Sequence, residues 1–191
     1  METLFHENKS FKNIKYSEKE TRNREFDTCS FLNCDFSDGI FTSGKFIDCV
    51  FTGCNLSNAK LDHCQLNNAI FKDCKLMGIN FTDCNDFLFA VKFDGCILDY
   101  ASFAKKKMVK TSFTRSSLKN ADFTESDLSG SAFPDSDLTD AIFYRTMLKE
   151  TDFSAAMNFI IDPELNNIKK AKFSLQGVVG LLNKYDIKIE L

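Results

Sequence analysis

Residues 111–140 read TSFTR SSLKN ADFTE SDLSG SAFPD SDLTD, and every block of five has Phe or Leu at its third position. The same beat runs without exception from Phe26 to Phe81 and again from Leu88 to Phe153, where Met108 alone is neither Phe nor Leu. A strict short period is typical of a solenoid, in which each repeat buries its apolar side chains by stacking on its neighbours. The sequence therefore predicts an elongated repeat fold.

A second position of the repeat, two residues before the Phe or Leu, carries a small side chain in most repeats, namely Cys, Gly, Ala, Ser or Thr. Neither the helical period of 3.6 nor the strand period of 2 fits a beat of five. We therefore expect a chain that turns a corner at every repeat. From Leu88 onward Phe and Leu also alternate, as a coil with an even number of sides would show if opposite sides carried the same residue type.

Triplets such as Ala121-Asp122-Phe123 and Ser126-Asp127-Leu128 are similar to the A(D/N)LXX motif of pentapeptide-repeat proteins, and the similarity covers residues 26–157. The resemblance implies an all-β fold, a right-handed quadrilateral β-helix with four five-residue sides in each coil. We expect three parts: a cap or irregular first coil at 1–25, the β-helix at 26–157, and a loop, a last partial coil and a C-terminal helix and strand at 158–191.

The composition fits one elongated domain in the cytoplasm. No apolar run approaches the roughly 18 to 20 residues of a membrane span, and Met1 to Lys9 has no apolar segment typical of a secretory signal. All eight cysteines fall on the small inward position of the repeat, where a buried thiol behaves as a small apolar group. A zinc site is the alternative for the pairs Cys29, Cys34 and Cys49, Cys54, but we expect reduced structural thiols, which favour a cytoplasmic protein.

The register breaks between Phe81 and Leu88, which lie seven residues apart, so that two extra residues enter at 82–87. A bulge or short loop must absorb them. One interpretation is a recognition knuckle that displays Asp83, Asp86 and Phe87. The other is a passive junction between two stacks.

The C-terminal stretch changes its period. Leu175, Val178, Val179 and Leu182 have the spacing of a short amphipathic helix. Tyr185, Ile187, Ile189 and Leu191 then alternate as in a strand. A solenoid must cover its open end, and a self-complementary apolar surface can join two chains about a two-fold axis. We therefore expect a homodimer whose contact includes Leu175, Val178, Val179, Leu182, Ile187 and Ile189.

This ending resembles the Qnr quinolone-resistance branch of the pentapeptide-repeat family, as does the block Phe31-Leu32-Asn33-Cys34-Asp35-Phe36-Ser37. The resemblance implies a rod that imitates DNA, binds DNA gyrase or topoisomerase IV and protects them from fluoroquinolones. The long side loops of several Qnr proteins have no counterpart here. The alternative is a structural or scaffold protein whose partner is not a topoisomerase.

No catalytic constellation appears: the sequence has no phosphate loop, nucleophile elbow or metal motif. We therefore expect no enzyme, no cofactor, no metal, no small-molecule substrate and no membrane partner. Lys105, Lys106, Lys107 and Lys110 form a basic patch, but phosphates would be repelled elsewhere on an acidic rod, so nucleic acid is not the expected partner.

Charge sets a limit on the imitation of DNA. Residues 26–160 have a net charge of minus five, from 18 acidic and 13 basic residues. A shaft of about 31 Å, at about 4.8 Å per coil, corresponds to a duplex with about 18 phosphate charges. Imitation must therefore rest on the rod shape and a local acidic stripe. The candidate partner contacts are the outward acids Asp83, Asp86, Asp122, Asp127 and Asp137.

Overall fold

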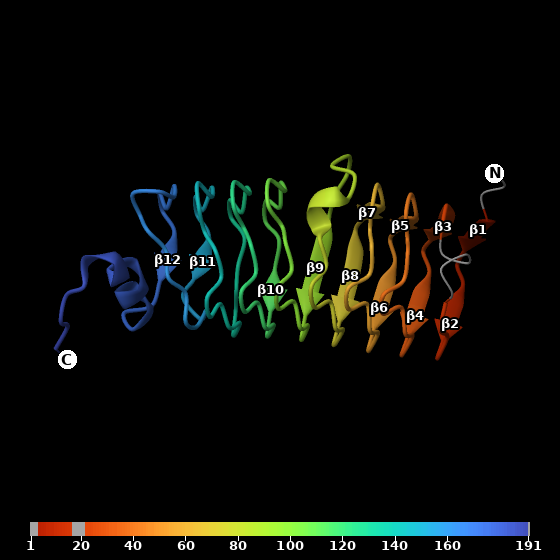
Figure 1. Ribbon diagram of the computed structural model, residues 1–191, viewed down its shortest axis with the longest axis horizontal. Helices are drawn as coiled ribbons and strands as arrows, with labels where there is room; N and C mark the ends of the chain where they lie inside the picture. The colour runs from red at the N-terminus through yellow and green to blue at the C-terminus, as the bar shows by residue number, and fades with distance from the viewer. Residues whose placement is uncertain (1–3, 17–21, 191) are drawn as a thin grey trace.

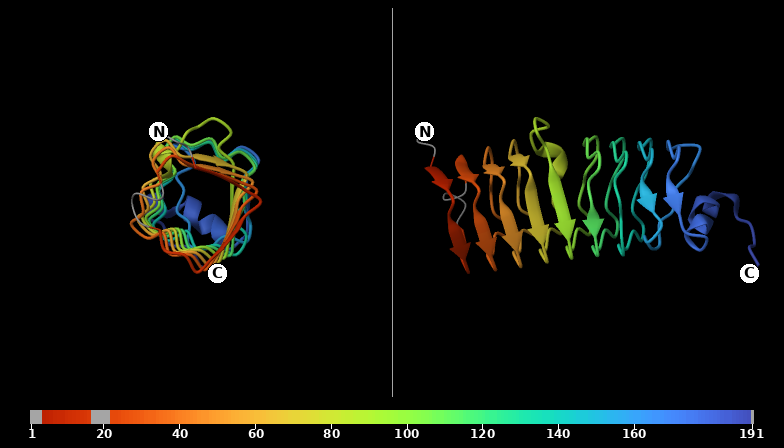
Figure 2. Two further views of the ribbon diagram at one scale, coloured as in Figure 1. Left: turned by 90° about the vertical axis from the view of Figure 1, so that its right-hand side faces the viewer. Right: turned by 180° about the vertical axis from the view of Figure 1, so that it is seen from behind.

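The computed structural model describes residues 4–16 and 22–190 and is a long rod of stacked coils (Figure 1). Strands of successive coils pair in parallel at an offset of twenty residues, as Phe31 does with Phe51. The view along the rod in Figure 2 shows coils of nearly the same four-sided outline stacked on one another. The prediction of an all-β parallel solenoid is confirmed.

Short strands of two to four residues form three parallel sheets along the sides of the rod. The first sheet contains β1 (Leu4–Glu7), β3 (Arg24–Asp27), β5 (Lys45–Ile47) and β7 (Gln65–Asn67). The second contains β2 (Ser10–Lys12), β4 (Ser30–Leu32), β6 (Val50–Thr52), β8 (Ala69–Lys72), β9 (Val91–Asp94) and β10 (Phe113–Thr114). The third pairs β11 (Asp152–Phe153) with β12 (Lys172–Phe173).

The core is built of columns of Phe rings. Phe93, Phe113 and Phe133 stack with ring centroids 5.3 and 4.9 Å apart. On another side of the coil, Phe103, Phe123 and Phe143 stack at 5.3 and 5.2 Å. Rings of the two columns meet edge to face, which is a favoured geometry for aromatic pairs. Leu occupies the sides between them, which explains the alternation of Phe and Leu.

The small side chains at the inward position fit into the core and also form hydrogen bonds. The Cys54 thiol donates to the Phe31 carbonyl at 3.4 Å, and the Ser136 hydroxyl donates to the Phe113 carbonyl at 2.8 Å. Cys, Ser and Thr at this position therefore give buried carbonyls of the preceding coil a hydrogen-bond donor. All eight cysteines are buried and unpaired, as predicted. Burial raises the pKa of Cys49 and Cys64 to about 12.

The C-terminal segment differs from the prediction. In place of one amphipathic helix it forms two short 3₁₀ helices, η2 (Gly177–Leu181) and η3 (Asn183–Tyr185). Gly177 and Gly180 are poor α-helix formers and weaken the expected helix. Residues 186–190 form no strand, because none of the described strands offers them a ladder of hydrogen bonds; Leu191 lies outside the described residues. Within the described ranges, no helix is long and apolar enough to cross a membrane.

Candidate partner-binding surfaces

The register break lies at residues 85–90, which we call the knuckle. The offset between paired strands changes from twenty residues, as in Phe51 with Phe71, to twenty-two, as in Phe71 with Phe93. The amide of Asn85 still donates to Cys64 in the ordinary register, at 2.8 Å, so the extra residues enter after it. The knuckle follows the 3₁₀ helix η1 (Phe81–Asp83) and projects beyond the outline of the rod in Figures 1 and 2.

The prediction that the inward beat resumes at Leu88 is wrong. The Leu88 side chain is 53% exposed and its φ is 57°, while the neighbouring Phe87 is 68% exposed. The half-buried ring of Phe89 packs against the core, with its centroid 6.4 Å from that of Phe81. The inward position of Phe and Leu resumes at Phe93. Leu88 keeps the five-residue spacing to Phe93, but it lies in the segment that holds the two extra residues, and its side chain turns outward.

Lys106 does not belong to the expected basic surface patch. Its side chain is 2% exposed, and its Nζ donates to Asp86 Oδ1 and to the Cys84 carbonyl, each at 2.6 Å. The ammonium also lies 5.2 Å from the ring centroid of Phe89. Lys105, Lys107 and Lys110 remain exposed. The sequence holds one indication that Lys106 is buried. Lys106 lies two residues before Met108, at the position where other repeats have a small inward side chain, and Met108 replaces the usual Phe or Leu of the repeat.

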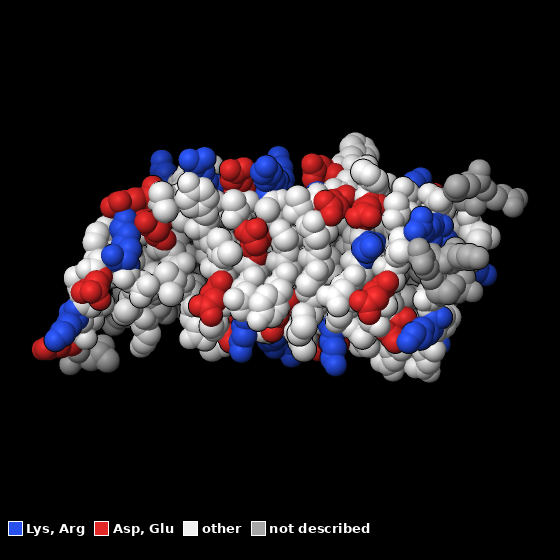
Figure 3. All heavy atoms as spheres, in the orientation of Figure 1, with Lys and Arg blue, Asp and Glu red and all other residues white. Residues whose placement is uncertain are grey.

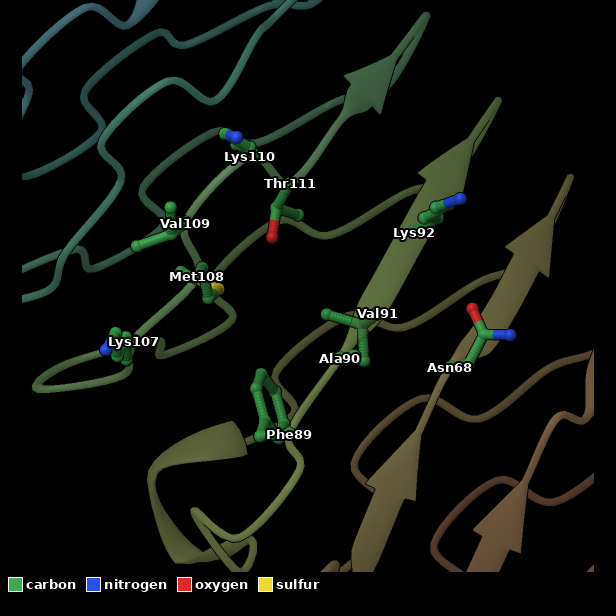
Figure 4. Close-up of a pocket in the computed structure, with 10 residues that line it drawn as sticks. All are labelled: Asn68, Phe89, Ala90, Val91, Lys92, Lys107, Met108, Val109, Lys110 and Thr111. Atoms are coloured by element: carbon green, nitrogen blue, oxygen red, sulfur yellow. The ribbon is translucent and has the colours of Figure 1, made fainter.

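A pocket of about 130 Å³ lies beside the knuckle (Figure 4). Phe89, Val91 and Met108 contribute its apolar lining, and Lys92, Lys107 and Lys110 are among its polar residues. It has a cationic margin, and it is too small to enclose a substrate of drug size.

The predicted contact acids do not form a single stripe. Parallel bridges place Asp122 between Ser102 and Ile142, Asp127 between Lys107 and Met147, and Asp137 between Ser117 and Met157. These three bridges belong to three different sides of the rod. Asp83 lies on the side of Asp122, because Asn80, which donates to Asp83 at 2.7 Å, pairs with Ser102. A flat partner surface can thus contact only part of this set at one time.

Several of these carboxylates also have structural tasks. Asp127 Oδ1 accepts from the amide and the hydroxyl of Ser129, at 3.0 and 2.6 Å, and Asp122 Oδ1 accepts from the Thr124 amide at 2.9 Å. Burial would raise the pKa of Asp137, but hydrogen bonds from Thr139 and Asn158, with the ion pair to Lys119, lower this pKa to about 2. Asp86 is held by Lys106. These contacts hold the carboxylates in fixed positions.

The charges of the rod are mixed. Figure 3 shows Lys and Arg interleaved with Asp and Glu along both long edges of the visible face. Ion pairs across neighbouring coils, such as Lys45 with Glu25 at 3.0 Å and Arg115 with Asp94 at 2.7 Å, offset part of the acidic charge. In the part of the chain that is described, no group of three or more His, Cys, Asp or Glu is placed to hold a metal ion.

The C-terminal segment closes the rod and leaves apolar side chains outside. The amide of Ile161 donates to Gly180 at 3.1 Å, and a Cβ on Gly177 would lie only 2.8 Å from the ring of Phe159. Lys184 pairs with Asp162 at 2.8 Å and with Glu164 at 2.7 Å, which lowers the pKa of both carboxyls. The predicted dimer residues remain at the surface: Leu175 is exposed by 84%, Leu182 is half-buried, and Val178, Val179, Ile187 and Ile189 are exposed.

Models of pentapeptide repeats match most of the chain: one, described as a pentapeptide repeat region, covers residues 24–103, and another, of eight pentapeptide repeats, covers 88–129 and 116–154. The chain belongs to the pentapeptide-repeat family. No match is found among the curated proteins.

Solved pentapeptide-repeat structures share the fold along nearly the whole rod. A trypsin-treated variant of QnrB1, a plasmid-mediated fluoroquinolone resistance protein, has a TM-score of 0.66 at 16% identity and covers 97% of this chain and 99% of its own. Full-length QnrB1 has a TM-score of 0.53 at 19% identity, covering 96% and 100%. HetL from the cyanobacterium Nostoc, a protein involved in heterocyst differentiation regulation, has a TM-score of 0.53 at 16% identity, covering 88% and 86%. At these identities the likeness establishes the fold.

Proposed function

We propose that this pentapeptide-repeat protein engages DNA gyrase or topoisomerase IV as a surrogate for duplex DNA and protects the enzyme from fluoroquinolones. The observation that carries the proposal is the likeness to QnrB1, a fluoroquinolone resistance protein, over 97% of the chain and 99% of the QnrB1 chain. This match includes both the shaft and the closed C-terminal end. The Qnr-like sequence block at residues 31–37 supports the same function.

The mechanism rests on shape more than on total charge. The stacked coils hold carboxylates such as Asp127 in fixed positions on a rigid rod. Little side-chain entropy is therefore lost when the partner binds them. The net charge of minus five in residues 26–160 is well below the charge of about 18 phosphates on a duplex of equal length. Electrostatics then contributes to approach and orientation, and direct contacts must supply the remaining affinity.

We propose further that two rods join through the C-terminal segment. Leu175, Val179 and Ile187 are apolar and exposed at the end of the rod, and a large exposed apolar patch is typical of an interaction site. Joining two rods end to end would double the length of the surrogate. Residues 186–190, which pair with no strand among the described residues, would find a strand partner in the second copy.

A competition measurement tests the proposal. A labelled DNA duplex is bound to gyrase or to topoisomerase IV, and the purified protein is added at low salt. We expect the protein to displace the duplex, and the displacement to weaken as salt screens the exposed charges beyond about 8 Å near physiological ionic strength. Retention of the duplex on both enzymes at a large excess of the protein would contradict the proposal.

The alternative is a scaffold function with a partner other than a topoisomerase. The match to HetL favours it, because HetL is a pentapeptide-repeat protein involved in a regulatory process and has the same TM-score as full-length QnrB1. Under this alternative the protein displaces no duplex from either enzyme, yet its knuckle and C-terminal end remain available to another protein.

A further inference from the structure

We propose that the pocket beside the knuckle binds a small organic anion, which carries a phosphate or carboxylate group on a single apolar ring or branched chain. Lys92, Lys107 and Lys110, which we call the lysine rim, hold the anionic group, and the apolar lining of the pocket holds the ring or chain. Recognition of such a ligand goes beyond the proposed function, because it involves no topoisomerase.

The pocket lies where the first sheet of the rod is interrupted. That sheet ends at β7, and on the same side of the rod the parallel bridges resume at Lys107, which pairs with Asp127. Residues from both sides of the interruption line the pocket, namely Asn68 after β7 and residues 107–111. A cavity of about 150 Å³ can bind benzene, so a pocket of about 130 Å³ that opens to solvent suits one ring or a short branched chain.

The floor of the pocket is apolar. Val91 and Met108 are buried, and Phe89 is half-buried and packs against the core. Figure 4 shows these three side chains in the middle of the pocket, with the lysine rim around them. Met108 lies where other repeats have Phe or Leu, and its unbranched thioether side chain adapts to the group that packs on it. The floor therefore favours the apolar part of a ligand over water.

The lysine rim has no counter-ion of its own. Its three side chains are exposed and form no ion pair within the described ranges. Other lysines of the rod pair with a carboxylate of the neighbouring coil, as Lys45 does with Glu25 and Lys119 with Asp137. The rim is therefore a local concentration of positive charge on a rod with a negative net charge, and such a concentration attracts anions.

The acids nearest to the pocket already have partners. Asp86 of the knuckle pairs with Lys106 at 2.6 Å, and Asp94, two residues after the start of the rim, pairs with Arg115 at 2.7 Å. Asp127 Oδ1 accepts hydrogen bonds from the amide and the hydroxyl of the serine two residues further on. A ligand that enters the pocket thus meets positive charges that these carboxylates do not fully neutralise.

A backbone amide adds a further donor to the pocket. At this corner of the rod the amide of Thr28 donates to the Ile47 carbonyl of the following coil at 2.9 Å. One coil later the amide of Asp48 donates to Asn67 at 2.9 Å. Asn68 holds the next position of this series, but no carbonyl among the described residues accepts from its amide. Because the series donates toward the following coil, the Asn68 amide faces the pocket that Asn68 lines, where it can donate to water or to an anion.

The combination of rim and floor determines the class of ligand. Charge-assisted hydrogen bonds from an ammonium group to a phosphate or carboxylate are roughly twice as strong as neutral ones. An apolar body on the floor adds free energy in proportion to the area that it removes from water. An inorganic anion uses the rim alone, and a neutral ring uses the floor alone. The pocket therefore selects a ligand that has both parts.

Isothermal titration calorimetry of the full-length protein tests the inference with four probes: phenyl phosphate, benzoate, inorganic phosphate and phenol. We expect phenyl phosphate or benzoate to bind on the order of tenfold more tightly than inorganic phosphate and phenol, because each combines an anionic group with a ring. The comparison of phenyl phosphate with benzoate shows which anionic group the rim prefers. The methyl resonance of Met108 locates the bound ring, since an aromatic ring on the floor of the pocket shifts it.

Variants separate the rim from the floor. Lys107→Gln combined with Lys110→Gln should weaken the binding of phenyl phosphate on the order of tenfold, because charge-assisted hydrogen bonds are lost. Lys105→Gln combined with Lys169→Gln removes the same charge at exposed positions outside the pocket and is the matched control. Ala90→Phe places a ring in the pocket from an exposed position, and it should reduce the affinity for phenyl phosphate to that for inorganic phosphate. Circular dichroism verifies that each variant retains the fold.

Three results would each overturn the inference. One is that neither phenyl phosphate nor benzoate binds the unmodified protein more tightly than inorganic phosphate does. Another is that the methyl resonance of Met108 does not shift when either of them binds. The third is that the control variant weakens binding as much as the rim variant, since attraction by the net charge would then be sufficient. None of these measurements uses a topoisomerase, so the proposed function is tested separately.

Discussion

The Nζ of Lys106 lies 2.6 Å from Oδ1 of Asp86, although the lysine side chain is 2% exposed and the aspartate side chain 83% exposed. The pair therefore crosses from the core of the rod to its surface, at the point where two extra residues enter a coil. Such a contact exists because the loop turns Leu88 outward and leaves space inside for another side chain.

This pair leads to a prediction about stability. Asp86→Ala should lower the free energy of unfolding by about 1 to 3 kcal/mol, because the buried ammonium loses the carboxylate with which it pairs. Lys106→Met should change the stability by less than about 1 kcal/mol, because an apolar side chain fills the site without a buried charge. Urea unfolding measures both. A larger loss for Lys106→Met than for Asp86→Ala would contradict this account.

The Phe columns should dominate the stability of the shaft. Phe123 is fully buried between Phe103 and Phe143, so Phe123→Ala should cost about 3 to 5 kcal/mol. Phe87→Ala is the control, since a mainly exposed ring should change the stability by no more than about 0.5 kcal/mol. Thermal or urea unfolding followed by circular dichroism tests both. Equal effects of the two variants would show that the column is not the core.

The thiols of Cys49 and Cys64 should be unreactive in the native rod. Burial raises the pKa of Cys49 and Cys64 to about 12, so the reactive thiolate is essentially absent from these residues at pH 8. We expect a thiol reagent to label these two cysteines slowly in the native protein and to label all eight cysteines rapidly after unfolding, with mass spectrometry as the measurement. Rapid modification of Cys49 or Cys64 in the native state would be inconsistent with the structure.

Asp137 should contribute to stability only above acidic pH. Its pKa is lowered to about 2 in the folded rod, below the value of about 3.9 in an unfolded chain. Its stabilisation is therefore present above about pH 4 and is lost as the pH falls toward 2. Solvent screening limits the effect to about 1 kcal/mol.

The comparison of Asp137→Asn with the unmodified protein measures this contribution. The difference in unfolding free energy should shrink between about pH 4 and about pH 2. Asp140→Asn, at an exposed corner, is the control and should alter the acid limb of the stability curve less. A difference for Asp137→Asn that stays constant over this range would argue against the lowered pKa.

The end of the rod should control the oligomeric state. Val179→Asp or Leu182→Asp would place a charge in an apolar contact, and an unpaired charge is strongly unfavourable there. We expect light scattering at micromolar concentration to report a dimer for the unmodified protein and a monomer for these variants. Val109→Asp, at an exposed position on the shaft, should remain dimeric. A monomeric unmodified protein would rule out the dimer.

The periodic part of the fold is predictable from the sequence, because burial of Phe113, Leu118 and Phe123 follows from the beat alone. The knuckle is not, since counting residues locates a break only to within one repeat and cannot tell that Leu88 turns outward. The sequence places Lys106 in a basic surface patch, since lysine is rarely buried. Its burial depends on a partner, Asp86, that only the loop geometry supplies.

The candidate sites are less predictable than the core for a related reason. Asp122, Asp127 and Asp137 share one repeat position, but the corners of the coil turn them to different sides. The amphipathic spacing of Val178 and Leu182 indicates an α-helix, whereas the glycines and the close packing on Phe159 give 3₁₀ turns. The repeat pattern determines which side chains are buried, and it says little about how the outward side chains are arranged.

The measurement that tests the central claim most directly is DNA supercoiling by gyrase in the presence of ciprofloxacin, with and without the purified protein at low salt. We predict that the protein restores supercoiling at inhibitory ciprofloxacin. Unchanged inhibition at a large excess of the unmodified protein, with the same result for decatenation by topoisomerase IV, would contradict the account.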